Sequence, residues 1–331
     1  MSIKVAINGT GRIGIIVAKI ITSRSDIELV AINTTAEPEM LEYLLKYDSV
    51  HKGAYSKIID ENTIEINGRQ IALFSNRNPD ELDFGAVGAE LVIECTGAFL
   101  TTQKAKSFLK NGVKKVVMSA PAKDDTPTYV LNINTEDYNG EAIISNASCT
   151  TNCLAPICKV LDDAFGIEDG LMTTIHSYTN DQSILDVKHS SDVRRARAGA
   201  INMIPTTTGA AKAIAKVMPH LKNKLNGYAM RVPTPDVSVV DLTVNLKKGT
   251  TVEEVNAVFK DAAANEFFGL IEIDKEKRVS TDFIGSTYSA TFIPDMTTLV
   301  DGNTLKVLAW YDNEWGYSSR LVDMCIFVGN R

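Results

Sequence analysis

The feature that most constrains the fold is a glycine-rich hexapeptide, Gly9–Gly14 (GTGRIG), near the N-terminus. It follows an apolar, strand-like run at residues 3–8 and precedes a run with helical spacing at residues 12–22. A G-x-G-x-x-G turn between a strand and a helix lets the backbone approach a pyrophosphate, which unpaired N–H groups at the helix start bind. The motif therefore predicts a dinucleotide-binding β-α-β unit with contacts from Gly9, Gly11 and Gly14; an ordinary tight turn is the alternative.

The rest of the first half alternates strand-like runs with helical patterns. Strand-like runs occur at residues 27–33, 91–94, 115–118 and 142–145, and a helical pattern occurs at residues 37–47. Asn67-Gly68, between two short β-rich runs, signals a tight hairpin. Buried strands separated by helices are typical of a mostly parallel sheet covered on both faces. The predicted fold class of this half is an α/β Rossmann-type dinucleotide-binding domain.

The pattern changes after Cys149. Residues 237–246, 288–293 and 304–311 alternate, which indicates strands with one buried face, and residues 317–328 return to helical spacing. We therefore predict an α+β catalytic domain with a mostly antiparallel sheet at residues 149–312, and a dinucleotide-binding domain made of residues 1–148 with 313–331. The polar, basic stretch at about residues 177–202 shows no clear period, and a loop of that length is usually functional.

Charge and cysteine content restrict the partners and the compartment. The chain has 34 basic and 41 acidic residues and a net charge of −7, so no overall field attracts nucleic acid or anionic lipid. No stretch approaches the roughly 18 apolar residues of a membrane helix, and the N-terminus lacks a signal-peptide pattern. The odd number of cysteines, 5, favours free thiols in the cytoplasm over a disulfide framework. We expect no membrane partner, no specific nucleic acid and no metal site.

Cys149 is the candidate nucleophile and His176 the candidate base. The segment SNASCTTN, residues 145–152, joins a strand end to a helical run that begins near Cys149. A thiol at a helix N-terminus feels the positive end of the macrodipole, which is expected to lower its pKa. His176 follows the strand-like run at residues 171–175, and beside Cys149 it would activate the thiol. The residues alone leave open a structural role for both side chains.

Four segments together resemble phosphorylating glyceraldehyde-3-phosphate dehydrogenase (type I). They are Gly9–Gly14, SNASCTTN, RVPTP at residues 231–235 and WYDNE at residues 310–314, and they occur in order over essentially the whole chain. The resemblance implies oxidation of D-glyceraldehyde 3-phosphate to 1,3-bisphosphoglycerate in glycolysis and gluconeogenesis. Cys149 would form a thioester, His176 would exchange protons, NAD or NADP would accept hydride, and inorganic phosphate would cleave the thioester.

The same resemblance implies where the ligands bind. Substrate phosphate is expected at Thr179 and Arg231, with Asp181 nearby. For inorganic phosphate the implied residues are Ser148, Thr150, Thr208 and Gly209, although residues 206–209 alone fit an ordinary helix cap equally well. The implied cofactor contacts are Arg12, Ile13, Arg77, Ser119, Asn313 and Tyr317. Family members place the long loop at subunit contacts, bordering the neighbour's cofactor, which implies a homotetramer.

The chain departs from the family pattern where the cofactor's ribose is expected. Thr34 replaces the usual ribose-binding Asp, Thr10 replaces a frequent Phe, and Ile15 replaces a frequent Arg. In the long loop, Val187-Lys188 follows Asp186 where strictly NAD-dependent members often have Gly-Pro. A carboxylate repels a 2′-phosphate whereas a hydroxyl does not, so Thr34 and Lys188 favour NADP. Glu37 is the alternative ribose-binding carboxylate.

Three other interpretations compete with this one. Erythrose-4-phosphate dehydrogenase shares the thiol chemistry but deacylates with water. Semialdehyde dehydrogenases share the architecture without the SNASCTTN and RVPTP pair. A binding module that lost activity is the third, although each residue proposed for chemistry is present. Among the other notable residues, Cys153 is interpreted as core, and Arg194, Arg195 and Arg197 as ion-pairing rather than nucleic-acid-binding.

Overall fold

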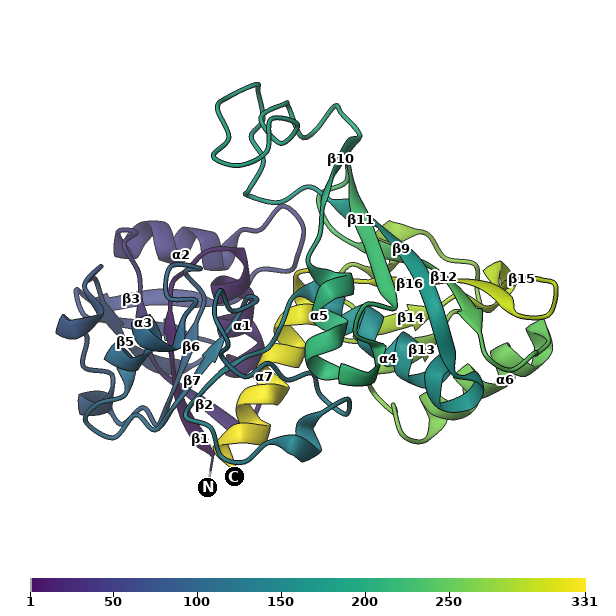
Figure 1. Ribbon diagram of the computed structural model, residues 1–331. Coiled ribbons are helices and arrows are strands. Elements are labelled where there is room, and N and C mark those ends of the chain that lie inside the picture. Colours follow the sequence, from purple (N-terminus) through teal and green to yellow (C-terminus); the bar gives the residue numbers. More distant parts are fainter. Residues whose placement is uncertain (1) are drawn as a thin grey trace. The chain divides into compact units, whose positions relative to one another are not determined.

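The computed structural model describes residues 2–331 and divides into two compact units (Figure 1). The first unit consists of the chain through Leu131 together with Thr135–Ser148 and Ser318–Arg331. The second consists of Asn132–Asn134 and Cys149–Tyr317. Each unit is built around one eight-stranded sheet.

The sheet of the first unit has the strand order β3-β4-β5-β2-β1-β6-β7-β8. Strands β5, β2, β1, β6, β7 and β8 pair in parallel, whereas β3 and β4 form antiparallel ladders at one edge. The hairpin between β4 and β5 turns at Asn67 and Gly68, whose φ angles of 50° and 80° are left-handed. The strands are β1 (Ile3–Asn8), β2 (Ile27–Asn33), β3 (Ser56–Asp60), β4 (Thr63–Ile66), β5 (Arg69–Phe74), β6 (Leu91–Glu94), β7 (Lys115–Met118) and β8 (Ile143–Ser145).

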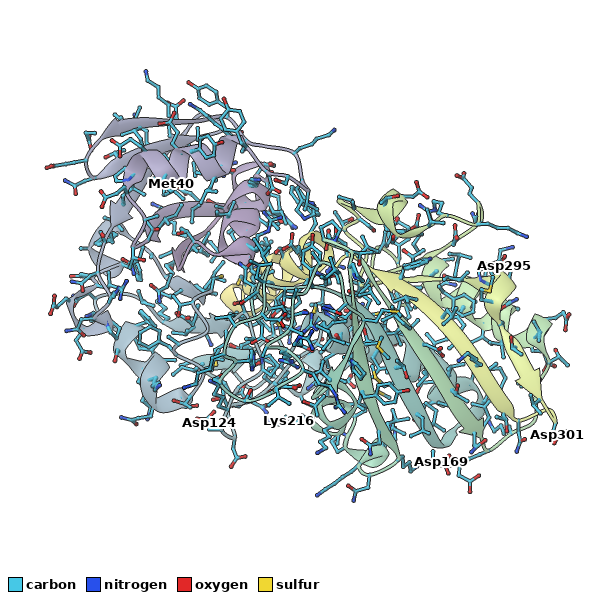
Figure 2. All side chains as sticks on the ribbon, turned by 90° about the horizontal axis from the view of Figure 1, so that it is seen from above. Met40, Asp124, Asp169, Lys216, Asp295 and Asp301 are labelled. Carbon is cyan, nitrogen blue, oxygen red and sulfur yellow. The ribbon has the colours of Figure 1, made fainter. Side chains whose placement is uncertain are left out.

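Helices pack against this mostly parallel sheet. Helix α1 buries nine of its residues, from Gly14 to Thr22, whereas α2 buries only Leu41 and Leu45 and directs Met40 outward (Figure 2). The C-terminal helix returns to β1, because a Cβ at Gly329 would lie only 2.7 Å from the Ile3 side chain. The helices are α1 (Arg12–Thr22), α2 (Pro38–Lys46), α3 (Thr102–Ala105) and α7 (Trp315–Gly329), with 3₁₀ turns η1 (Pro79–Glu81), η2 (Gly85–Val87), η3 (Lys106–Phe108) and η4 (Thr135–Asp137).

The sheet of the second unit is mostly antiparallel and has the order β10-β11-β9-β12-β16-β14-β13, with β15 also paired to β16. Two of its ladders are parallel, β11 with β9 and β13 with β14. The strands are β9 (Ile167–Ser177), β10 (Ile204–Thr207), β11 (Leu225–Val232), β12 (Ser238–Leu246), β13 (Ile271–Ile273), β14 (Ala290–Phe292), β15 (Thr298–Val300) and β16 (Thr304–Tyr311). Together, the two sheets confirm the predicted fold class of both halves of the chain.

Three helices accompany the second sheet. The apolar face of α6 contributes Phe259, which stacks on Phe292 of β14 with ring centroids 3.9 Å apart. The helices are α4 (Cys149–Phe165), α5 (Ala210–Val217) and α6 (Val252–Ala264), with 3₁₀ turns η5 (Pro219–Leu221), η6 (Ser280–Phe283) and η7 (Pro294–Met296). Among residues 2–331, no helix combines the length and the apolar character that crossing a bilayer requires.

Three predicted strands are shorter in the structure, including the run at residues 142–145, of which β8 covers only Ile143–Ser145. The run at residues 288–293 forms a strand only at Ala290–Phe292, and β12 begins at Ser238 because Val237 has a left-handed φ of 65°. A β-branched residue in that region is strained, so the chain turns sharply there before it enters the sheet. Residues 178–203 contain no helix or strand, in agreement with the prediction of a long loop.

Candidate active site

Cys149 is the first residue of α4, at the end of a sharp turn that follows β8. The turn contains Ala147, a buried residue with a left-handed φ of 57°, whose N–H donates to the Ser145 hydroxyl at 3.1 Å. Strain of this kind outside glycine is found where a side chain must be presented in a fixed direction. The turn therefore places a partly exposed thiol at the N-terminus of a 17-residue helix.

His176 lies beside Cys149 although 27 positions separate them. It is the penultimate residue of β9, is 4% exposed, and holds its Nε2 atom 3.5 Å from the Cys149 Sγ atom. This is the arrangement of a nucleophile and a base that exchange one proton. The pairing predicted from the sequence is therefore present in the structure as a contact.

The electrostatics differ from the sequence prediction. Burial raises the pKa of the Cys149 thiol, while the Arg231 guanidinium and the Thr150 hydroxyl act in the opposite direction. The prediction of a lowered thiol pKa is wrong for this arrangement, because desolvation outweighs the stabilising groups. Burial, and then the Arg231 charge, lower the pKa of His176 to about 3. Desolvation thus opposes the charged form of both groups.

Arg231 contacts His176 directly. Strands β11 and β9 are parallel, and Arg231 is the register partner of His176. The Nη1 atom of Arg231 lies 2.8 Å from His176 Nδ1 and 2.9 Å from the Ser177 carbonyl oxygen. Burial lowers the pKa of Arg231, and among the described residues its buried Nε atom has no hydrogen-bond partner. The site thus contains a desolvated cation with donor capacity left for an anion.

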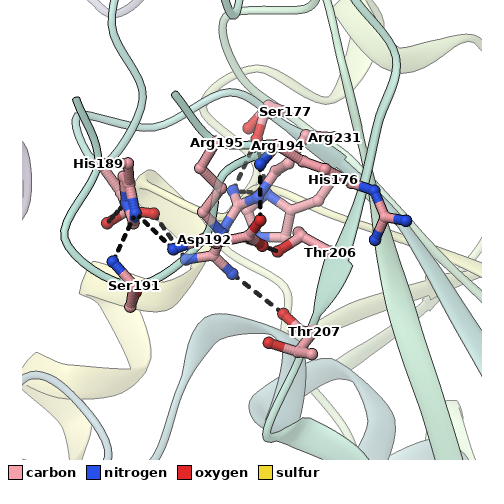
Figure 3. A network of polar contacts seen from close by, with 11 residues as sticks. His176, Ser177, His189, Ser191, Asp192, Arg194, Arg195, Thr206, Thr207 and Arg231 are labelled. Carbon is pink, nitrogen blue, oxygen red and sulfur yellow. Dashed lines mark hydrogen bonds and ion pairs between the residues drawn. The ribbon is translucent and has the colours of Figure 1, made fainter. Parts of the chain in front are cut away.

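The long loop is held by a polar network (Figure 3). Arg195 donates to the Thr206 hydroxyl at 2.8 Å, to the Asp181 carboxylate at 2.6 Å and to the Thr207 carbonyl at 3.1 Å. His189 accepts the N–H groups of residues 191 and 192 at Nδ1, so its Nε2–H donates to Asp181 at 3.2 Å. Arg195, which the sequence assigned to ion pairing, is confirmed in that role and also holds the end of β10.

The remaining predicted phosphate contacts lie in several places. The Thr150 hydroxyl contacts the Tyr311 hydroxyl at 2.9 Å, and Thr179 begins a turn in which Gln182 N–H donates to its carbonyl at 2.8 Å. Thr208 and Gly209 precede α5, where the Thr208 hydroxyl accepts from Ala210 N–H at 3.2 Å. Ser148, the residue before α4, belongs to the first unit.

The glycine loop of the first unit has the shape that a pyrophosphate requires. Gly9 has a φ of 99°, and a Cβ at Gly14 would lie 2.0 Å from the Gly9 carbonyl oxygen, so both positions require glycine. Gly11 caps α1 and has open space where its Cβ would be. Arg12 forms an ion pair with Asp48 at 3.1 Å, and Ile13 follows it in the first turn of α1.

Thr34 lies at the carboxyl end of β2, where the sheet is expected to meet the ribose. Its hydroxyl is 2.6 Å from the hydroxyl of Thr10 in the glycine loop and accepts from Ala36 N–H at 3.1 Å. Three buried side chains of the neighbouring strands are also hydrogen-bonded to one another. The Asn8 amide N–H donates to the Glu94 carboxylate, and the Asn8 amide oxygen accepts from the Asn33 amide at 2.7 Å. Two residues that the sequence predicted near the adenosine, Arg77 and Ser119, follow β5 and β7 of the same sheet.

In the second unit, Asn313 is held in one orientation. Its Oδ1 atom accepts from the Ser177 hydroxyl at 2.9 Å and from the Ser238 hydroxyl at 2.7 Å, which leaves the amide N–H groups as its donors toward a ligand. Tyr317 is buried in the first turn of α7, and Lys188 is exposed on the long loop.

Sequence reasoning missed two buried groups of the second unit. Tyr311 connects Thr150 to Thr174 through its hydroxyl, at 2.9 and 2.8 Å, and its ring lies 5.9 Å from that of His176. Asp236 is 2% exposed, and burial with the neighbouring charge of Asp312 raises its pKa to about 9. The RVPTP and WYDNE segments contain these residues or adjoin them, but nothing in either segment alone indicates burial.

Comparisons with known proteins agree over the whole chain. Residues 3–102 match the family described as "Glyceraldehyde 3-phosphate dehydrogenase, NAD binding domain", and residues 148–313 match "Glyceraldehyde 3-phosphate dehydrogenase, C-terminal domain". The glyceraldehyde-3-phosphate dehydrogenase of Geobacillus stearothermophilus is 50% identical, with 100% of this chain and 99% of the relative covered. Glyceraldehyde-3-phosphate dehydrogenase 1 of Bacillus cereus is 50% identical, with 99% of each covered, and the chloroplastic form A of Zea mays is 50% identical, with 99% and 83% covered.

Proposed function

Because the chain belongs to the glyceraldehyde 3-phosphate dehydrogenase family, we propose that it oxidises D-glyceraldehyde 3-phosphate to 1,3-bisphosphoglycerate with a nicotinamide cofactor and inorganic phosphate. The observation that carries the proposal is the 3.5 Å contact between Cys149 Sγ and His176 Nε2. A thiolate suits the reaction, because it is a strong nucleophile and later a good leaving group.

Cys149 acts as the nucleophile and His176 as the proton-transfer group. His176 accepts the thiol proton as the sulfur attacks the aldehyde carbon, and it donates that proton to the developing alkoxide to give the hemithioacetal. When the hydride leaves the carbon, His176 accepts the hydroxyl proton again. Oxidation leaves an acyl thioester on Cys149. Inorganic phosphate attacks the thioester carbon, the sulfur leaves as thiolate, and the acyl phosphate is released.

Two anion sites serve the substrates. Arg231 and Thr179 bind the phosphate of the aldehyde, and the unpartnered, buried Nε of Arg231 supports this role. Asp181 contributes indirectly, because it holds Arg195. Ser148, Thr150, Thr208 and Gly209 bind inorganic phosphate, with support from the position of Thr208 and Gly209 at the start of α5.

The glycine loop fits the cofactor's pyrophosphate. The turn in which Gly9 and Gly14 exclude any side chain, together with the open Gly11, supports contacts from Gly9, Gly11, Arg12, Ile13 and Gly14. The nicotinamide ring, when bound, supplies the hydride acceptor. Asn313 donates its amide N–H to the carboxamide, with Tyr317 nearby, and Arg77 and Ser119 contact the adenosine half.

We further propose that the enzyme uses NADP, alone or beside NAD. The Thr10 and Thr34 hydroxyls, 2.6 Å apart at the end of β2, present no charge to a 2′-phosphate. The family resemblance, which puts the long loop beside a neighbouring subunit's cofactor, makes Lys188 a candidate cation for that phosphate. Thr34→Asp is expected to lower the ratio of kcat/KM for NADP over NAD by about tenfold or more, equivalent to about 1.4 kcal/mol. An unchanged ratio would refute this account of selectivity, and Thr35→Asp is the matched control.

We also propose that the chain forms a homotetramer and resides in the cytoplasm. The long loop exposes large apolar side chains, with Ile184 84% and Val193 86% exposed, which supports burial against other subunits in a homotetramer. Light scattering after size exclusion measures the assembly mass. The free state of the five cysteines supports a reducing compartment such as the cytoplasm.

The decisive experiment follows reduced cofactor by absorbance with glyceraldehyde 3-phosphate, using NAD and NADP in parallel, with and without phosphate. Reduction that depends on phosphate supports the proposal. Turnover that needs no phosphate and prefers erythrose 4-phosphate would instead favour the water-deacylating relative. Folded, reduced protein without turnover on either aldehyde would leave only a binding role.

A further inference from the structure

Four neighbouring parallel strands of the first unit, β6, β1, β2 and β5, are connected at their carboxyl ends by buried polar groups (Figure 1). Glu94, Asn8 and Asn33 are the last residues of β6, β1 and β2, and they are 0%, 1% and 5% exposed. The fourth member is the backbone of Asn76, two residues after β5 ends. Ligands of such sheets bind beyond the carboxyl ends of the strands, so this Glu94–Asn76 network borders the proposed dinucleotide site.

The direction of the hydrogen bonds in this network follows from its backbone end. Asn33 Oδ1 accepts from the Asn76 N–H at 3.0 Å, and Asn33 Nδ2 donates to the Asn76 carbonyl at 2.8 Å. Because a backbone N–H only donates and a carbonyl only accepts, this contact fixes the orientation of the Asn33 amide. Asn33 Nδ2 therefore also donates to Asn8 Oδ1, at 2.7 Å, and Asn8 Nδ2 points at Glu94, 2.6 Å from Oε2.

Glu94 supplies the acceptor that this arrangement requires. Its Oε2 atom accepts from Asn8, and its Oε1 atom accepts from the Thr96 N–H at 2.7 Å and from the Thr96 hydroxyl. Each of these donors is neutral, and burial raises the pKa of Glu94, so the site disfavours a carboxylate and yet contains one. A glutamine has the same shape but one acceptor and one donor, so an N–H would oppose either the Asn8 amide or the Thr96 N–H.

The network also holds two segments that are proposed to contact the cofactor. In the glycine loop, the Gly9 N–H donates to the Asn33 carbonyl at 2.9 Å, and a Cβ on Gly9 would lie 2.6 Å from Thr96 Cγ2. At the other end, Asn76 immediately precedes Arg77, one of the predicted adenosine contacts. A reversed amide within the network would therefore disturb the pyrophosphate end and the adenosine end of the site together.

We propose that Glu94 is a positioning residue for the dinucleotide. As the acceptor at one end of the network, it keeps both asparagine amides in one orientation, and so holds the glycine loop and residues 76–77 in the arrangement that binds the cofactor. Glu94 is fully buried and acts through its neighbours rather than by contact with the cofactor. The inference rests on the proposed use of NAD or NADP.

Exchanging the acid and the amide tests the direction of the network. Glu94→Gln alone sets two N–H groups against each other, Asn8→Asp alone sets two carboxylates against each other, and each should raise the Kd for the dinucleotide about tenfold. In the double variant Asn8→Asp/Glu94→Gln, the amide at position 94 donates to the carboxylate at position 8, which still accepts from Asn33. Every donor again meets an acceptor, so the Kd should return to within about threefold of the wild-type value.

Isothermal titration calorimetry of the full-length protein with NAD and with NADP measures the Kd, and thermal unfolding shows separately whether each variant is folded. Glu90→Gln is the matched control, because Glu90 precedes β6 at its other end and is exposed, and it should not change the Kd. Initial rates add a second readout. In Glu94→Gln the KM for the cofactor should rise by a larger factor than kcat falls, as expected for a group that acts on binding.

The outcomes separate this inference from the proposed function. A wild-type protein that binds neither dinucleotide rejects both. If the wild type binds, then equal binding by folded Glu94→Gln rejects the positioning role, even where the melting temperature falls. A double variant that binds no better than the single variants also rejects it. If neither single variant folds, the double variant must fold and bind within about threefold of the wild type, or the role is rejected.

Discussion

The hydroxyl of Tyr311 lies 2.9 Å from that of Thr150 and 2.8 Å from that of Thr174, so a single phenol connects the nucleophile's helix to β9. Tyr311→Phe leaves two buried hydroxyls without that partner. We expect the free energy of unfolding to fall by about 1–3 kcal/mol, the range for unsatisfied buried polar groups. Thermal unfolding checks this, with Tyr228→Phe as the control, because Tyr228 is 53% exposed. Equal melting temperatures for the two variants would contradict the structural role of the phenol.

Replacing the nucleophile tests the covalent mechanism. Cys149→Ser is expected to reduce phosphate-dependent turnover by at least about a thousandfold, because a hydroxyl at neutral pH is far less nucleophilic than a thiolate. Cys153→Ser is the matched control, four residues further along α4 and fully buried. Initial rates and mass spectrometry of the acyl adduct measure the effect. Substantial turnover by Cys149→Ser would overturn the assignment.

The buried Asp236 predicts a dependence of stability on pH. Its pKa of about 9 in the folded protein exceeds the ordinary 3.8, so the stability it contributes is present below about pH 4 and is lost as pH rises toward 9. Asp236→Asn removes this loss. The variant should gain up to about 1.4 kcal/mol relative to the wild type for each pH unit within that window.

Urea unfolding at about pH 5 and about pH 8 measures the difference in stability between Asp236→Asn and the wild type. Asp241→Asn is the control, since Asp241 pairs with a partly exposed Lys306 at the surface of the sheet. A difference that stays constant with pH would show that Asp236 is ionised in the folded protein.

Replacing Arg195 is expected to destabilise the protein more than replacing Arg197, although both arginines lie in the long loop. Arg195 has three partners in the network around β10, whereas Arg197 pairs with Asp186 at a site where both side chains are about 60% exposed. Arg195→Ala should lower the free energy of unfolding by about 1–3 kcal/mol and slow turnover. Arg197→Ala should change it by less than about 0.5 kcal/mol. Comparable effects from both variants, by thermal unfolding and initial rates, would contradict the network's role.

Much of the fold followed from local patterns. Helix α1 occupies residues 12–22, the run identified from helical spacing. This prediction succeeded because the glycine turn and the repeat of apolar residues are both local features of the sequence. The hairpin at Asn67 and Gly68 was predicted for the same reason. Assigning catalytic roles to Cys149 and His176 depended on the resemblance to a family, because their positions in the sequence are equally compatible with structural roles.

Contacts between distant strands were not predictable from such patterns. Tyr311 reaches Thr150 across 161 positions, and Arg231 reaches His176 across 55. Neither sequence periodicity nor a motif reports which residues become register partners in a sheet. The raised pKa of the Cys149 thiol has the same origin, because burial comes from packing around α4 rather than from its own residues.

The register of β9 and β11 makes the chemistry of this site depend on strand length. Arg231 meets His176 because the two are paired in a parallel ladder that begins at Leu225 and Gly170. Side chains alternate across a strand, so inserting or deleting one residue between Leu225 and Arg231 would turn the guanidinium to the opposite face. A change of one residue inside this ladder would therefore separate the guanidinium from the imidazole.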